Sequence, residues 1–211
     1  MNVTRIVVFA KAPRPGRVKT RLISALGEAG AARLAGRMLK HALEAAWAAD
    51  IGPVELCVDP PPDNADWRNI PFPPGVQTSA QGEGDLGARM ARAAQRSLDA
   101  HQRVLLIGTD CPQLDAQTLR DAALLLDTHH AVMHPARDGG YVLLGLSAFH
   151  PALFDDMPWS TAQVATLTRE RLAALGWRAA VGRTLTDIDE PADLLALPPG
   201  WRDLTDMAVA S

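Results

Sequence analysis

Short apolar runs alternate along this chain with longer segments in which apolar residues recur at helical spacing. The clearest strand signals are residues 6–10, 54–58 and 104–108, apolar apart from Glu55 and Gly108, and the last of these is the strongest. Continuous apolar runs of this length are typical of strands that are buried on both faces of a parallel sheet. Weaker extended segments are predicted at residues 76–78, 131–133, 141–145 and 178–181.

The segments between these runs predict helices. Residues 28–49 are rich in Ala and Leu at helical spacing, and one helical turn is expected near Trp67. Further helices are predicted at residues 85–99, 116–127, 161–175 and 191–197. Strands that alternate with helices of about 10–15 residues indicate βαβ units, and therefore an α/β fold with a mostly parallel sheet covered on both faces. We find no internal repeat, and we expect one domain over residues 1–200 followed by a tail over 201–211.

Composition narrows the class of protein. The 211 residues are 47% apolar and 21% charged, which is enough for one core without disulfides or a structural metal. Cys57 and Cys111 form no paired motif, so a reducing compartment is expected. The start of the chain has no signal-peptide pattern and no run of about 20 apolar residues occurs, so we expect a cytoplasmic protein without a membrane span. A net charge of −3 argues against general nucleic-acid binding.

Basic residues nevertheless crowd into the loop that follows the first predicted strand. In open α/β sheets ligands bind outside the carboxyl ends of the strands. This loop would place Lys11, Arg14, Lys19 and Arg21 around a phosphate chain, and Gly16 would let the backbone approach it. The loop has neither the Walker A spacing nor a GxGxxG fingerprint. A solvated polar loop is the alternative, and the position at a strand exit favours phosphate binding.

Carboxylates follow two other predicted elements. Asp110 comes at the end of the strand at 104–108, where it could ligate Mg²⁺ or Mn²⁺ together with substrate phosphates. The alternative is that Asp110 caps the turn before the next helix. Asp187 and Asp189 share a face in extended chain, so one of them could complete the metal site. A helix start beginning near Glu190 is the alternative explanation for part of this acidic segment.

Three glycine-containing or polar segments are weaker signals. Asp138 leads into Gly139 and Gly140, which could let a ligand approach the backbone or could form a plain turn. Residues 81–90 place Gln81 and three glycines ahead of a helix, where they could meet a base or sugar edge. Residues 157–164 are explained by a helix N-cap at Ser160 or Thr161 with Trp159 packed beside it.

Taken in order, these segments resemble a known family. FAKAPRPGRVKTRL, GDLGARM, GTDCP, DGGYVLLGL and WST match the motifs of the bacterial GT-A-like transferases labelled rSAM/selenodomain-associated transferases. That family lies within the nucleotide-diphospho-sugar transferase superfamily, and the match runs from about residue 4 to residue 197. The resemblance implies a single-domain GT-A-like three-layer α/β/α sandwich around a mostly parallel mixed sheet.

The resemblance also implies residue roles and a divalent metal, Mg²⁺ or Mn²⁺. Phosphate would be bound by Lys11, Arg14, Gly16, Lys19 and Arg21, and the base by Gln81 and Gly87. Asp110 and Asp189 would hold the metal. The pocket for the donor and the acceptor would include Gly139, Gly140, Tyr141, Trp159, Ser160 and Thr161. The candidate catalytic residues are Asp110, Asp138 and Lys19, with Asp138 as a base on the acceptor side.

Relatives of this kind carry out two reactions. The first is glycosyl transfer from a nucleoside-diphosphate sugar to an acceptor, which the sequence does not identify. The second is nucleotidyl transfer, in which a nucleoside triphosphate forms a conjugate and releases pyrophosphate. Many glycosyltransferases of this fold carry Asp-x-Asp at the metal strand, whereas residues 109–112 read TDCP with a single carboxylate. A non-catalytic nucleotide-binding scaffold is the third hypothesis, against which the intact charged residues argue.

Overall fold

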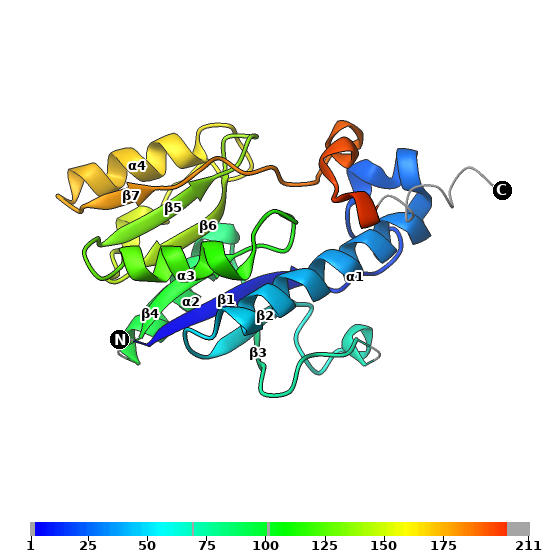
Figure 1. Ribbon diagram of the computed structural model, residues 1–211, viewed down its shortest axis with the longest axis horizontal. Coiled ribbons are helices and arrows are strands. Elements are labelled where there is room, and N and C mark those ends of the chain that lie inside the picture. The colour runs from blue at the N-terminus through cyan, green and yellow to red at the C-terminus, as the bar shows by residue number, and fades with distance from the viewer. Residues whose placement is uncertain (1–2, 69, 101, 202–211) are drawn as a thin grey trace.

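Seven strands form one mixed sheet in the computed structural model, which describes residues 3–68, 70–100 and 102–201 (Figure 1). The strand order is β3-β2-β1-β4-β6-β5-β7. Strand β6 runs antiparallel to both of its neighbours, β4 and β5, and all other pairings are parallel. The mostly parallel mixed sheet predicted from the sequence is therefore confirmed.

The elements follow the predicted order closely. The strands are β1 (Thr4–Lys11), β2 (Val54–Asp59), β3 (Gln77–Ala80), β4 (Arg103–Ile107), β5 (Ala131–Pro135), β6 (Tyr141–Leu146) and β7 (Ala179–Val181). The α-helices are α1 (Ile23–Ala49), α2 (Leu86–Asp99), α3 (Ala116–Leu125) and α4 (Val164–Ala174). Short 3-10 helices are η1 (Thr20–Leu22), η2 (Ala65–Trp67), η3 (Pro151–Leu153), η4 (Pro191–Ala196) and η5 (Pro199–Trp201).

The end of the chain differs from the expectation in one respect. Residues 191–197 were expected to form a helix, and they form the 3-10 helix η4, which spans only six residues. Most of the expected tail, residues 202–211, lies outside the described residues. Among the helices of the described ranges, none is long and apolar enough to cross a membrane.

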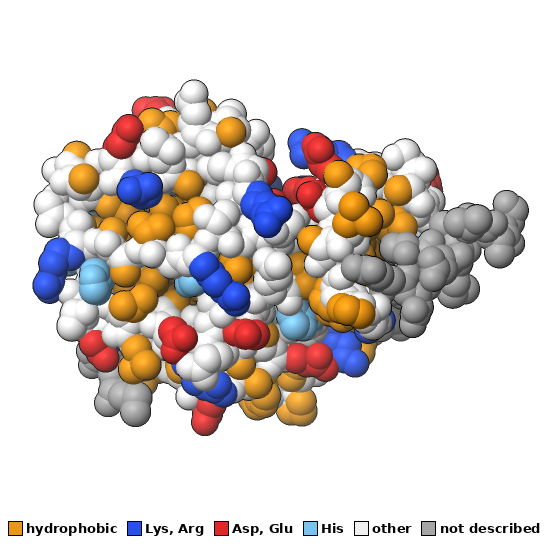
Figure 2. Space-filling model, turned by 45° about the horizontal axis from the view of Figure 1, so that its top comes forward, with side chains coloured by type: hydrophobic (Ala, Val, Ile, Leu, Met, Phe, Trp, Pro, Cys, Tyr) orange, Lys and Arg blue, Asp and Glu red, His pale blue; other side chains and the backbone are white. Residues whose placement is uncertain are grey.

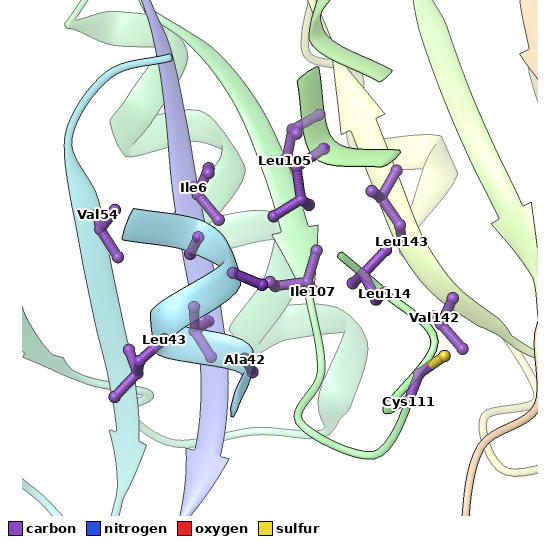
Figure 3. Close-up of a cluster of buried hydrophobic side chains, with 14 of the residues drawn as sticks. Ile6, Ala42, Leu43, Val54, Leu105, Ile107, Cys111, Leu114, Val142 and Leu143 are labelled. Atoms are coloured by element: carbon purple, nitrogen blue, oxygen red, sulfur yellow. The ribbon is translucent and has the colours of Figure 1, made fainter. Parts of the chain in front are cut away.

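Helices cover both faces of the sheet because successive strand residues point to opposite faces. On one face Ile6, Leu105 and Ile107 are buried in a core that α1 and α3 complete (Figure 3). On the other face Val7 and Leu106 pack with residues of α2 and α4. The five strands between β3 and β7 are therefore largely buried on both sides, which explains their mainly apolar sequences.

A third apolar cluster joins the two ends of the chain. Leu34 and Met38 of α1 pack against Ile188 and Leu197 from the C-terminal segment. In Figure 1 this segment leaves β7, crosses the molecule and returns beside the start of α1. The ring of Trp201 contacts His41, with ring centroids 5.3 Å apart. This packing holds the residues before η4 close to the loop that follows β1.

The close approach of strands at Gly145 provides a test of this packing. A Cβ atom at Gly145 would lie 2.5 Å from Cγ1 of Val132 and 2.7 Å from Cδ2 of Leu105. We therefore expect Gly145→Ala to lower the free energy of unfolding by about 1–3 kcal/mol through overpacking, measured by urea denaturation. The control Gly200→Ala meets no atom within 4 Å and should stay within about 0.5 kcal/mol of the unmodified protein. An equally stable Gly145→Ala protein would contradict this account of the core.

Candidate functional site

A cavity of about 550 Å³ lies at the carboxyl ends of the central strands. Its walls come from the end of β1, the loop after β4, the start of β6 and the residues that precede α4. Figure 2 shows a hollow between a larger and a smaller part of the molecule, with acidic and basic side chains along it. The position agrees with the rule that ligands of open α/β sheets bind beyond the carboxyl ends of strands.

The lining of the cavity divides into three groups of side chains. The cations are Lys11, Arg17, Lys19 and Arg21. The carboxylates are Asp110, Asp138, Asp187 and Asp189. An apolar wall is formed by Phe9, Leu86, Met90, Tyr141 and Trp159. The cavity thus offers opposite charges and an aromatic surface within one space.

Lys19 lies at the centre of the charged group. Its Nζ atom is 2.6 Å from Oδ1 of Asp110 and 2.7 Å from Oδ1 of Asp189, and it donates a hydrogen bond to the carbonyl oxygen of Ile188. The Lys19 side chain is only 6% exposed. Burial alone would lower the pKa of Lys19, but the charges of Asp110 and Asp189 outweigh it and raise the pKa above its usual value.

The backbone of Lys19 explains how the side chain reaches this position. Lys19 has φ 48° and ψ 42°, in the left-handed region that non-glycine residues adopt at a cost of about 1–2 kcal/mol. The 3-10 helix η1 begins at the next residue, and the amide of Leu22 donates to the carbonyl of Lys19. The loop therefore turns sharply at Lys19 and directs its side chain into the site.

Asp110 does not cap the helix that follows it. Asp115 has that role, because its carboxylate accepts a hydrogen bond from the amide of Thr118 at 2.8 Å. The Asp110 carboxylate instead faces Lys19 and remains 45% exposed toward the cavity. Its carbonyl oxygen accepts a hydrogen bond from the amide of Ile188 at 2.8 Å, which brings the C-terminal segment alongside.

The helix-start explanation holds for Glu190 and Asp193 but leaves Asp189 for the site. Glu190 and Asp193 form a reciprocal capping box at the start of η4. The carboxylate of Asp189 is 41% exposed and contacts Lys19. Asp110 and Asp189, 79 positions apart in the sequence, therefore lie on either side of one ammonium group.

The oxygen atoms around Lys19 suit a hard divalent cation. Two carboxylate oxygens and one carbonyl oxygen lie 2.6–2.7 Å from the position that Nζ of Lys19 occupies. Mg²⁺ in nucleotide enzymes is commonly held by one or two carboxylates together with substrate phosphates. In the described ranges no group of three or more His, Cys, Asp or Glu side chains is arranged for a metal. Asp110 and Asp189 could supply two carboxylate ligands, and the remaining ligands of a metal would have to come from a bound phosphate or from water.

The other predicted phosphate-binding residues divide between the cavity and its surroundings. Lys11 and Arg21 line the cavity. Arg14 forms an ion pair with Asp66, and neither Arg14 nor Gly16 lines the cavity. Gly16 has φ 73°, so it shapes the loop. Arg17, which was not assigned a role from the sequence, does line the cavity.

Gln81 is buried at the edge of the cavity and is held by the protein itself. Its amide nitrogen donates to the carbonyl oxygens of Ala10 and Cys57, both at 3.1 Å, and its amide oxygen accepts from Arg89. Gln81 therefore ties the ends of β1 and β2 together. Gly87 does not line the cavity, and a Cβ atom there would lie 2.5 Å from Nε1 of Trp159. Gly87 thus makes room for Trp159.

The loop at residues 138–140 packs against residues 159–165. Gly139 has φ 91°, and a Cβ atom there would lie 2.2 Å from the carbonyl oxygen of Ala162. The amide of Ala165 donates to the carbonyl of Gly139 at 2.9 Å. Asp138, Gly140, Tyr141, Trp159, Ser160 and Thr161 line the cavity, whereas Gly139 supports its wall.

The expected N-cap in this segment is wrong. Helix α4 begins at Val164 with Gln163 at the N-cap, and no side chain caps it. The hydroxyl of Thr161 instead donates to the carbonyl of Pro158 at 2.7 Å. Ser160 has φ 63°, so the turn places it in the left-handed region beside the cavity. The segment is therefore shaped as a cavity wall ahead of the helix.

Asp187 is a lining residue whose role the sequence left open. Burial, followed by the charge of Asp138, raises the pKa of Asp187 to about 6. Its proximity to Asp138 was not visible from the sequence, because the two residues come from different loops. The Cys111 thiol also has its pKa raised by burial, to about 11, so it stays protonated and packs as a small apolar group.

Comparisons with known proteins agree with this architecture. The family described as "Uncharacterized protein conserved in bacteria (DUF2064)" matches residues 42–161. A crystal structure of a protein from Desulfovibrio desulfuricans G20, assigned as a nucleotide-diphospho-sugar transferase, is 29% identical with a TM-score of 0.86. The match covers 100% of this chain and 96% of that one. A search among curated proteins gave no match.

Two more distant structures share the fold. The Rv0371c protein of Mycobacterium tuberculosis H37Rv, in complex with manganese, is 16% identical with a TM-score of 0.52, covering 98% of this chain and 99% of that one. The 4-diphosphocytidyl-2C-methyl-D-erythritol synthase of Anaerococcus prevotii DSM 20548 is 9% identical with a TM-score of 0.60, covering 92% and 94%. The GT-A-like fold expected from the sequence is confirmed.

The raised pKa of Asp187 predicts a pH-dependent effect on stability. The folded state binds this proton more tightly than the unfolded state, so ionised Asp187 destabilises the fold. We expect Asp187→Asn to be more stable than the unmodified protein by about 1 kcal/mol above pH 6, after solvent screening at this half-exposed group. The difference should fall to zero as the pH drops from about 6 to about 4. Urea denaturation across this range measures it.

The control for this measurement is Asp63→Asn, which removes a carboxylate from an exposed loop. Its stability difference should not vary over the same pH range by more than about 0.5 kcal/mol. A constant offset for Asp187→Asn at every pH would contradict the raised pKa.

Proposed function

This chain belongs to the DUF2064 family of bacterial proteins, and from the geometry of its cavity we propose that it is a metal-dependent transferase acting on a nucleotide-activated donor. The observation that carries the proposal is the cluster in which Lys19, Asp110 and Asp189 meet beside three further cations. A diphosphate chain with a divalent metal is complementary to such a cluster, because it offers negative oxygens to the cations and a positive ion to the carboxylates.

The chain's own residues would act mainly by position and charge. Lys11 at the end of β1, Arg17 in the loop that follows and Arg21 in η1 would hold the phosphate oxygens. Asp110 and Asp189 would hold the metal, which when bound neutralises the charge that develops on the leaving phosphate. Asp110 and Asp189 are already held by Lys19 before the donor binds, so little reorganisation of these carboxylates would be needed.

Asp138 is the proposed base on the acceptor side. Its Oδ1 atom accepts a hydrogen bond from the amide of Gly140 at 2.8 Å, which fixes the orientation of the carboxylate. Asp138 is exposed at the cavity and lies near Asp187, whose pKa is raised first by burial and then by the charge of Asp138. A carboxylate in this position can accept the proton of an attacking hydroxyl group.

We propose glycosyl transfer from a nucleoside-diphosphate sugar as the reaction. The aromatic wall supports it, because Trp159 and Tyr141 offer apolar surface to the C–H face of a sugar ring next to the charged cluster. The Desulfovibrio structure assigned as a nucleotide-diphospho-sugar transferase, which matches the full length of this chain, supports the same reaction. In that reaction the nucleoside diphosphate leaves from the anomeric carbon of the sugar.

Nucleotidyl transfer is the second candidate, and two observations favour it. The cavity contains four cationic side chains, which are enough to contact the oxygens of three successive phosphates. The loop after β4 presents one carboxylate to the cavity, Asp110, instead of an Asp-x-Asp pair. In this reaction an acceptor oxygen attacks the α-phosphorus and pyrophosphate leaves, so the same cations and carboxylates serve both candidates.

The phosphate-binding role of the basic loop can be tested with two arginines that lie three positions apart. Arg17 lines the cavity, whereas Arg14 is paired with Asp66 outside it. We expect Arg17→Gln to weaken diphosphate binding about tenfold, in line with the loss of one charge-assisted hydrogen bond. Arg14→Gln should leave the Kd unchanged. Calorimetric titration with nucleoside diphosphates measures both, and equal effects would contradict the assignment of the cavity.

The type of donor can be tested by thermal denaturation with a panel of ligands. Nucleoside diphosphates, nucleotide sugars and triphosphates are compared, each with and without Mg²⁺ or Mn²⁺. A ligand at 100 times its Kd stabilises the fold by about 2.7 kcal/mol. A metal-dependent rise in Tm with nucleotide sugars supports glycosyl transfer, and a rise with triphosphates alone supports nucleotidyl transfer.

Asp110→Asn is the matched variant for this panel. It keeps the shape of the side chain and removes the charge that the metal requires, so the metal-dependent part of the Tm rise should disappear. Asp99→Asn, an exposed change at the end of α2, should respond as the unmodified protein does. A rise that persists in Asp110→Asn would contradict the metal role. Ligand binding without any transfer product would support a binding scaffold.

A further inference from the structure

The Lys19 ammonium is fully coordinated by the protein. An ammonium group has three N–H donors, and three oxygen atoms lie 2.6–2.7 Å from Nζ, from Asp110, Ile188 and Asp189. With its side chain 6% exposed, Lys19 has little contact with solvent. The other lining lysine, Lys11, is exposed at the end of β1. Lys19 therefore differs from an exposed lysine, whose ammonium group is free to bind a phosphate directly.

We propose that Lys19 is a displaceable internal cation that competes with the divalent metal for Asp110 and Asp189 and is released when a phosphate chain accepts its ammonium group. This inference rests on the proposed function, since it concerns how the same site takes up its metal and nucleotide. Lys19 would then couple the binding of the metal to the binding of the nucleotide, in addition to contacting phosphate.

Geometry makes the competition unavoidable. Oxygen ligands lie about 2.0–2.1 Å from Mg²⁺, and the two Oδ1 atoms lie 2.6 Å and 2.7 Å from Nζ, so a metal bound to both would lie within a few ångströms of the ammonium. A metal bound through the other carboxylate oxygens would still lie within a few ångströms of the ammonium. Two cations about 4 Å apart repel each other at the dielectric of a partly buried site. Lys19 must therefore move for the metal to bind well.

The same loop would hold phosphate oxygens that can accept the Lys19 ammonium group after it leaves the carboxylates. Arg17 and Arg21 flank it in sequence and line the cavity, so phosphate oxygens held by them would lie within reach of its side chain. Asp110 and Asp189 are 45% and 41% exposed, so a metal can approach them from the cavity. A metal that binds alone has to break the three contacts of Lys19 without replacing them. When a phosphate binds with the metal, the carboxylates contact the metal and the ammonium group contacts the phosphate. Metal and nucleotide should therefore bind with positive coupling.

The test is a titration of Mn²⁺ alone, followed by the electron paramagnetic resonance signal of free Mn²⁺. Lys19→Met keeps the length of the side chain and removes the competing charge, so Mn²⁺ should bind about tenfold tighter than to the unmodified protein. Lys11→Met removes the same charge from the same cavity but leaves both carboxylates paired with Lys19. It should change the affinity by no more than about twofold.

The outcomes separate this inference from the proposed function. Unchanged or weaker Mn²⁺ binding in Lys19→Met, or equal gains in both variants, would overturn the competition while the nucleotide panel still stands. If no variant binds Mn²⁺ at all, the metal dependence of the proposed function falls with it. A role of Lys19 confined to folding would lower the Tm of Lys19→Met without tightening Mn²⁺ binding.

A second measurement uses the unmodified protein, in case Lys19→Met does not fold. The protons of a buried ammonium group held by three oxygen atoms exchange slowly with water, so its ¹⁵N resonance can be observed. Mg²⁺ alone should leave the Lys19 resonance in place, and Mg²⁺ with pyrophosphate should shift it or broaden it. A resonance that stays unchanged while the amide spectrum shows Mg²⁺–pyrophosphate bound would overturn the proposal.

Discussion

The contact of one ammonium group with two carboxylates organises the functional end of this fold. Lys19 comes from the loop after β1, Asp110 from the loop after β4, and Asp189 from the segment before η4. Two carboxylates that face each other in a half-buried cavity repel, so they require a cation between them. The left-handed backbone of Lys19 and the bond from Ile188 to Asp110 are both consistent with this requirement.

The rest of the structure supplies a rigid frame for that contact. The central strands are buried on both faces, so the positions at which they end are fixed by packing of the core. The apolar cluster around Leu34 and Ile188 anchors the returning C-terminal segment on α1. On the opposite wall, Gly139 lets its loop approach the residues before α4 closely. Charged residues in loops are thus held to defined positions by elements that are not themselves part of the site.

The balance of charge in the cavity also has a physical consequence. Four carboxylates and four cations line one space, so in the protein alone they partly neutralise each other. The ligand proposed above, which carries both phosphates and a metal, would exchange these internal pairs for external ones without leaving a buried charge unpaired. A ligand with only one of the two charges would leave some internal pairs broken, which is costly at a partly buried site.

The sequence by itself determined the order of the elements, the mostly parallel sheet and the loops that carry chemistry. It did so because buried strands have a recognisable apolar pattern, and because loops at strand exits meet at one edge of the sheet. The structure brings together Lys19, Asp110 and Asp189, three of the residues that the sequence singled out, while their roles stay predictions. Only the tertiary structure decided that Arg17 lines the cavity and Arg14 does not. The tertiary structure also decided that Asp187 lies near Asp138. The direction of a side chain in an irregular loop depends on contacts between residues far apart in the chain, and no local sequence pattern records those contacts.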